Sequence, residues 1–157
     1  ISNTAYTFSG GNIAVPMTTE LAMTGDRTFS CWFKANGNQT GGRIYENTYL
    51  NSGIGLYNGN KLDAWHCSNG QSRNVVNITF GTLSEWHHLV YVADATNSLG
   101  KVYIDGALSG TMSATSSSCP SSWLGAYMRF GLGASGEVFN GIEKIELVTF
   151  AHGPFVT

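Results

Sequence analysis

The chain has 157 residues and a formal net charge of −2, and only 11% of its residues are charged, against roughly 25% in an average soluble domain. Its eight Lys and Arg form no basic cluster, which argues against nucleic-acid binding, because phosphate affinity comes from clustered cations. No apolar run approaches the roughly 20 residues of a membrane-spanning helix, so we expect no membrane insertion. The chain begins at Ile1, and we expect one domain over residues 1–157 that belongs to a longer or processed protein.

Helical periodicity is almost absent, and short alternating apolar runs recur between Gly- and Asn-rich turns. The abundant Gly, Ser, Thr and Asn are poor residues for a helix interior but suit turns between strands. Only residues 18–24 suit a short helical turn, and the polar, low-complexity residues 113–122 predict a loop. Strands are predicted near residues 5–8, 13–15, 28–34, 43–46, 54–57, 61–67, 75–80, 86–92, 101–104, 107–111, 129–132 and 142–150.

Two of the turns carry the short-range signal of a β-hairpin. Asp105-Gly106 separates two alternating apolar runs, and the tight two-residue turn needs positive φ at both central residues, which Asp and Gly tolerate. Asn58-Gly59 repeats the signal further towards the N-terminus. Both hairpins favour antiparallel pairing of consecutive strands.

A dozen short strands at this spacing favour a sandwich or a barrel. Several runs, including residues 89–92 and 142–148, are apolar on both faces, and such strands need cover from a partner sheet on one face and from loops on the other. We therefore expect an all-β fold, a two-sheet antiparallel jelly-roll sandwich. Cys31 lies inside one of the apolar runs and is expected to be a buried thiol.

Six stretches, in the same order along the chain, resemble the laminin-G-like domains of the concanavalin A-like lectin/glucanase superfamily. The most specific are Glu85-Trp86-His87-His88-Leu89 and Val102-Tyr103-Ile104-Asp105-Gly106. The other four are residues 6–15, 29–34, 53–62 and 139–145.

The resemblance implies a sandwich of two antiparallel sheets, one flat or convex and one concave. It also implies a binding role, because members of the family mostly bind glycans, other proteins or cell surfaces. Many of them bind calcium, but Ser9 and Glu143 stand where the family has Asp. Since calcium prefers several carboxylate oxygens, we assign no metal ligand and leave Ca²⁺ open as a cofactor.

The superfamily also includes glycoside hydrolases, which need two carboxyl groups facing one cleft. The nearest pair, Glu143 and Glu146, is three residues apart in a strand, so we expect the two side chains on opposite faces and predict no enzyme. His87 and His88 are adjacent and cannot chelate one ion together, so strand packing is expected for both. His66 is isolated, as is His152, and a surface position is the default expectation for each.

The four tryptophans divide into two pairs. Trp32 and Trp86 belong to the family motifs and are expected in the core. Trp65 and Trp123 lie beside polar turns, where an aromatic ring can stack on the apolar face of a sugar while polar neighbours pair with its hydroxyls. The alternative is that each covers one end of the sandwich. The candidate ligand-binding residues are Trp65, His66, Asn69, Trp123 and Tyr127.

Cys67 and Cys119 lie beside polar turns, and a disulfide between them would suit a chain that works outside the cytosol and would bring Trp65 near Trp123. Asp94 precedes a loop that could supply calcium oxygens, although a turn in which its side chain bonds the local backbone is the simpler interpretation.

We therefore expect a non-catalytic recognition module that binds carbohydrate or a cell-surface ligand. Its partners would be a glycan or a surface protein, and its setting extracellular, on a cell surface or on a virion surface. The alternative is a structural, decoration or adhesion domain of a virion or filament, in contact with other subunits of a larger assembly. A hydrolase remnant is a more distant third option.

Overall fold

A computed structural model describes residues 6–7, 13–16, 18, 26–35, 42–47, 52–68, 71–94, 97, 99–118, 127–131 and 142–152. These residues form strands and turns, and among them no helix is long and apolar enough to cross a membrane. The helical turn predicted for residues 18–24 lies outside the described part, apart from Thr18. The strands are β1 (Tyr6–Thr7), β2 (Ile13–Pro16), β3 (Arg27–Ala35), β4 (Arg43–Asn47), β5 (Ser52–Asn58), β6 (Lys61–Ser68), β7 (Gln71–Thr79), β8 (Trp86–Asp94), β9 (Leu99–Ile104), β10 (Ala107–Ser118), β11 (Tyr127–Phe130) and β12 (Ile142–His152).

Every predicted strand is present, and the largest difference lies at the end of β10. The loop prediction for residues 113–122 is wrong over residues 113–118, which continue the strand. Ser113 pairs with Asn74 and Ala114 with Arg73, so β7 also starts earlier than predicted. A Ser- and Thr-rich segment has no strong preference for strand or loop, and here pairing with a neighbouring strand decides its conformation.

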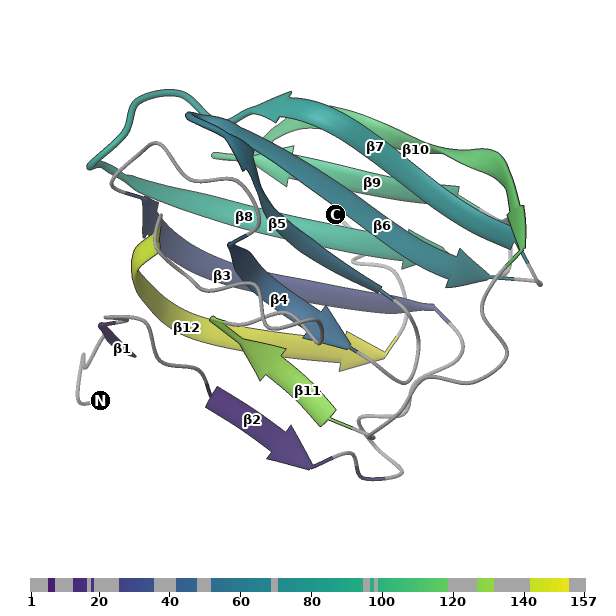
Figure 1. Cartoon of the computed structure of the whole chain (residues 1–157), viewed down its shortest axis with the longest axis horizontal. Helices are drawn as coiled ribbons and strands as arrows, with labels where there is room; N and C mark the ends of the chain where they lie inside the picture. The colour runs from purple at the N-terminus through teal and green to yellow at the C-terminus, as the bar shows by residue number, and fades with distance from the viewer. Residues whose placement is uncertain are drawn as a thin grey trace.

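The strands pair antiparallel in one continuous sheet of order β1-β12-β3-β8-β9-β10-β7-β6-β5-β4-β11-β2. The prediction of two separate sheets is not confirmed. The reason lies in β10, which pairs with β9 through residues 107–112 and with β7 through residues 113–118. The hydrogen-bond ladder therefore runs unbroken from one arm of the sheet, β1-β12-β3-β8-β9, to the other arm, β7-β6-β5-β4-β11-β2. The sheet curls, and Figure 1 shows β4 to β7 lying over β3, β8 and β9.

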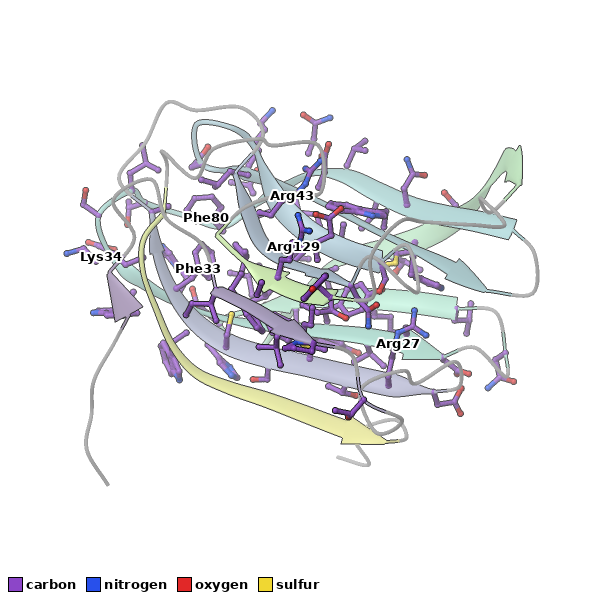
Figure 2. The ribbon with its side chains drawn as sticks, turned by 60° about the horizontal axis from the view of Figure 1, so that its bottom comes forward. Arg27, Phe33, Lys34, Arg43, Phe80 and Arg129 are labelled. Carbon is purple, nitrogen blue, oxygen red and sulfur yellow. The ribbon has the colours of Figure 1, made fainter. Side chains whose placement is uncertain are left out.

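The core fills the space between the two arms. Phe29 of β3 stacks on Tyr45 of β4 with ring centroids 4.5 Å apart. Phe33 meets Phe80 edge to face at 5.1 Å, and Figure 2 shows both rings between the arms. Cys31 is fully buried as predicted, and its burial raises the pKa of the thiol, which keeps it protonated and unreactive.

The prediction that Trp32 and Trp86 belong to the core is wrong. Their side chains are 40% and 38% exposed, whereas the neighbouring Phe33 and His87 are buried. Successive residues of a strand face opposite sides of the sheet, so when Phe33 and His87 point inwards both tryptophans must point outwards. The family motifs placed these rings on the right strands, and the strand period decided their face.

Both hairpins form. Asp105 and Gly106 have φ of 51° and 82° and connect Ile104 to Ala107, as predicted. The second turn is shifted by one residue: Asn58 pairs with Lys61, so the loop is Gly59–Asn60, and Gly59 has φ of 55°. Glycine, which adopts positive φ without a steric penalty, therefore occupies the first position of the turn.

Candidate functional site

Of the predicted ligand-binding residues that the structure describes, Trp65 and Tyr127 face outwards, whereas His66 does not. Trp65 lies half-buried on the outer face of β6, and Tyr127 is 39% exposed at the start of β11. Asn69 and Trp123 lie outside the described residues, as do Cys119 and the side chain of Cys67, so their proposed disulfide stays a prediction.

His66 is fully buried, which contradicts the expected surface position and removes it from any surface site. Its Nδ1 lies 2.9 Å from the Met112 sulfur, and its ring meets Tyr91 edge to face at 6.3 Å. The cause is again the strand period, because Leu62, Ala64 and His66 all face inwards while Trp65 faces outwards. The side chain of His152 lies outside the described part.

A row of outward-facing residues crosses the arm that carries Trp65. Trp65 of β6 pairs with Gly53 of β5, Gly53 pairs with Glu46 of β4, and Glu46 pairs with Arg129 of β11. Directly paired residues in an antiparallel sheet project their side chains from the same face. Four strands therefore place an aromatic ring, a carboxylate and a guanidinium in one line.

A second row lies beside the first, in which Gly55 pairs with Arg43 on one side and with Asp63 on the other. Tyr127 lies two residues before Arg129 on β11 and so shares its face. We call the surface formed by these six side chains the Arg–Trp face. Its members are Arg43, Glu46, Asp63, Trp65, Tyr127 and Arg129.

The two glycines of β5 let large neighbours lie flat on the strand. A Cβ on Gly53 would stand 2.5 Å from Cζ2 of Trp65, so the indole occupies the space that a side chain would need. A Cβ on Gly55 would stand 3.2 Å from Cδ of Arg43. The Arg43 guanidinium carbon in turn lies 4.6 Å from the centroid of the Trp65 ring, a cation–π contact. Trp65 is thus held between bare backbone and an arginine.

Tyr127 and Arg129 form a second such pair, with the guanidinium carbon 5.6 Å from the phenol ring centroid. The Nε of Arg129 is buried and has no hydrogen-bond partner in the part of the chain that the structure describes. Figure 2 shows Arg43 and Arg129 near each other on their neighbouring strands. The face therefore presents guanidinium groups beside the 39% exposed ring of Tyr127.

The two carboxylates of the face differ in their surroundings. Glu46 is only 9% exposed and lies in register with Arg129. Oδ1 of Asp63 accepts a hydrogen bond from the backbone N–H of Asn77 at 2.9 Å. Both carboxylates are therefore placed as hydrogen-bond acceptors that the protein already orients.

The histidine pair is structural, as predicted. His87 points inwards, and its ring nitrogens lie 2.8 Å from Oδ2 of Asp105 and 2.8 Å from the Thr82 carbonyl oxygen. His88 points outwards, shares a hydrogen bond of 2.8 Å with the Ser30 hydroxyl and packs on Trp32 at 5.0 Å. The two rings occupy opposite faces of β8.

Asp94 caps its own turn. Its two carboxylate oxygens accept hydrogen bonds of 2.8 Å from the backbone N–H and the side-chain amide of Asn97. These bonds lower the pKa of Asp94 and confirm the turn interpretation. Within the described ranges, no group of three His, Cys, Asp or Glu could hold a metal ion. The side chains of Glu143 and Glu146 are outside those ranges.

Sequence reasoning missed Arg43, Glu46, Asp63 and Arg129. A signal was present in residues 53–56, Gly-Ile-Gly-Leu, where glycines alternate with buried apolar residues. Such a strand has one face without side chains, and long side chains of the adjacent strands can lie across it.

Comparison with known proteins identifies the family and the fold of the chain. Residues 8–142 match a family described as the concanavalin A-like lectin/glucanases superfamily. No curated protein matches the sequence. The receptor binding domain of botulinum neurotoxin mosaic serotype C/D is similar in structure, with a TM-score of 0.69 and 15% identity over 97% of this chain and 39% of that one.

Two further solved structures resemble the chain. NanB sialidase from Streptococcus pneumoniae (K499G mutant) gives a TM-score of 0.67 and 14% identity over 97% of this chain and 26% of the other. Domain 4 of AbnA, an extracellular arabinanase from Geobacillus stearothermophilus in complex with arabinotriose, gives 0.60 and 19% over 95% and 70%. The chain thus spans about two fifths of the toxin binding domain and about a quarter of the sialidase.

Proposed function

The chain belongs to the concanavalin A-like lectin/glucanase superfamily, and from this premise we propose that it is a non-catalytic carbohydrate-recognition module of an extracellular or surface-displayed protein. The binding surface is the Arg–Trp face. Similar domains support a glycan as partner. Domain 4 of AbnA was solved with arabinotriose, and the binding domain of botulinum neurotoxin DC was solved with SialylT. Cell entry of botulinum neurotoxin type C is described as dependent on interaction with two ganglioside molecules.

One observation carries the proposal: the row from Trp65 through Gly53 and Glu46 to Arg129. It fixes a guanidinium donor and a carboxylate acceptor on neighbouring strands, and Tyr127, two residues before Arg129 on β11, adds an exposed apolar ring, so the groups that a sugar needs lie together. Because the row sits on paired strands and not on a loop, its geometry is set before a ligand arrives, and less conformational entropy is lost on binding.

The two aromatic residues have different roles in this proposal. The Trp65 ring is covered by Arg43 and packed on Gly53, so it positions the guanidinium and does not itself stack on a sugar. The exposed Tyr127 ring offers the stacking surface. The half-buried Arg129 beside it offers the N–H donors of its guanidinium group.

Binding without hydrolysis fits the state of the carboxylates. A glycosidase needs one carboxyl group that can donate a proton and a second across the scissile bond. Glu46 is only 9% exposed and lies in register with Arg129. Asp63 already accepts the Asn77 N–H. One carboxylate is thus buried and the other is engaged by the backbone, which favours a binding role over proton transfer.

The test is a glycan array followed by calorimetric titration of the best ligand. Tyr127→Ala and Arg129→Gln should each weaken binding by about tenfold or more. The melting temperature should stay nearly unchanged, because both side chains lie on the outer face of β11. Leu108→Ala, on an exposed residue of β10, is the control and should bind like the unchanged protein. Undiminished binding by both face variants would refute this assignment of the site.

A further inference from the structure

The opposite arm of the sheet carries a groove that the Arg–Trp face does not use. On its outer side Val90 of β8 pairs with Ser30 of β3 and Tyr103 of β9, and Val92 pairs with Lys101. A cavity of about 540 Å³ lies over these side chains. This is within the roughly 300–1,000 Å³ of small-ligand sites.

The floor of the groove is apolar. Val90 and Val92 are half-buried along its centre, and Leu99, 43% exposed, stands at one end. An antiparallel sheet with one solvated face normally carries polar residues there. Two consecutive outward valines therefore mark a surface that favours an apolar contact.

Two charged side chains line the groove, Asp94 and Lys101. Both carboxylate oxygens of Asp94 already accept hydrogen bonds from Asn97, and Ser30 is bonded to His88. Within the described residues, Lys101 makes no hydrogen bond or close ion pair, and it interacts electrostatically with Asp94. Lys101 is therefore the charged group of the lining that can still donate a hydrogen bond to a ligand.

We propose that this groove binds a small organic anion with an elongated apolar body. The anionic group contacts Lys101, and the body lies along Val90 and Val92 towards His88 and Trp32. From His88 to Asp94 the strand rises about 20 Å, enough for a chain of eight to ten carbons. This site is on the other arm from the proposed glycan surface and does not depend on it.

Octanoate and octan-1-ol form a matched pair of probes, since they share the chain and differ in charge. Calorimetric titration should show one saturable octanoate site. Lys101→Met, which keeps the length and apolar stem of the side chain, should weaken octanoate about fivefold, the value of a partly exposed ion pair, and leave octan-1-ol unchanged. Val92→Asp should abolish binding of both.

Tyr127→Ala is the matched control and should bind both probes normally, whereas Lys101→Met should keep its glycan-array signal. The two sites can therefore fail separately. Lys101→Met tests the groove even if Val92→Asp does not fold. No saturable octanoate binding, or equal loss of both probes in Lys101→Met, would overturn the proposal. So would a dimer in sedimentation that Val92→Asp dissociates, because a second copy would then occupy the groove.

Discussion

The carboxylate of Asp105 joins its hairpin turn to two consecutive residues of β8. Oδ2 lies 2.8 Å from Nδ1 of His87, and Oδ1 accepts the backbone N–H of His88 at 2.8 Å. The other nitrogen of His87 faces the Thr82 carbonyl oxygen at 2.8 Å. Asp105 therefore connects its turn to β8 through one side-chain and one backbone contact, and His87 is held between two oxygen atoms.

This contact predicts an acid-sensitive stability. Partial burial on its own would raise the pKa of Asp105, but the hydrogen bonds from His87 and the His88 N–H outweigh it and hold the pKa below its usual range. A carboxyl whose pKa is lower in the folded state stabilises the fold above its unfolded pKa of about 3.9, and this contribution is lost as the pH falls through the folded value. Urea unfolding between about pH 6 and pH 3 should show the loss.

Asp105→Asn is the informative variant, because Asn also tolerates the positive φ of this turn. It should reduce stability at pH 6 by about 1 kcal/mol and flatten the acid limb of the profile. Asp94→Asn is the comparison, because the pKa of Asp94 is lowered as well. This second variant measures how much of the acid sensitivity comes from a carboxyl group outside the His87 contact. An Asp105→Asn profile that keeps the full slope would assign the acid sensitivity to another carboxyl group.

Adjacent residues of β3 should differ sharply in their effect on stability. Phe33 is fully buried against Phe80 and His87, whereas Trp32 is 40% exposed. Phe33→Ala should cost about 3–5 kcal/mol, and Trp32→Ala less than about 1 kcal/mol, although Trp is the larger residue. Urea denaturation measures both, and comparable losses would place the indole in the core.

The strands could be predicted from the sequence because each of them carries its own apolar alternation and ends at a Gly- or Asn-rich turn. The faces of the aromatic residues could not be predicted as well, since Trp32 is as apolar as the adjacent Phe33 and the family motif gave the strand but not the side of the sheet. The course of β10 depends on pairing with β7, a contact between distant segments that local preference does not encode.

The candidate site shows the same limit. Trp65 and Tyr127 were found because an aromatic residue beside polar turns is a local feature. Arg43 and Arg129 are 86 positions apart in the sequence and meet only because β4 and β11 become neighbours. A single sequence carries little information about such lateral pairing, so the cationic half of the site emerged only from the structure.

Gly53 should be the least replaceable residue under the Arg–Trp face. The Cβ of Gly53→Ala would stand 2.5 Å from Trp65 and 2.7 Å from the Tyr45 carbonyl oxygen, so the indole must move. We expect a loss of about 1–3 kcal/mol in stability and weaker glycan binding, because Arg43 loses its support. Combining it with Trp65→Ala should recover part of the stability and none of the binding. Strictly additive stabilities would show that the indole and Gly53 do not compete for one space.

His66 provides the final test, because it separates a core residue from a binding residue. The ring is fully buried between Met112 and Tyr91, and a Cβ on Gly100 would stand 2.7 Å from its Cε1, so there is no room for a ligand at this position. His66→Ala should lower the free energy of unfolding measured in urea by about 2–4 kcal/mol, because it leaves a cavity between Met112 and Tyr91 in the core. At a temperature where the variant is still folded, its affinity for the best array glycan should equal that of the unchanged protein, while Tyr127→Ala should show the reverse, with weak binding and normal stability. A folded His66→Ala that fails to bind would return this histidine to the site.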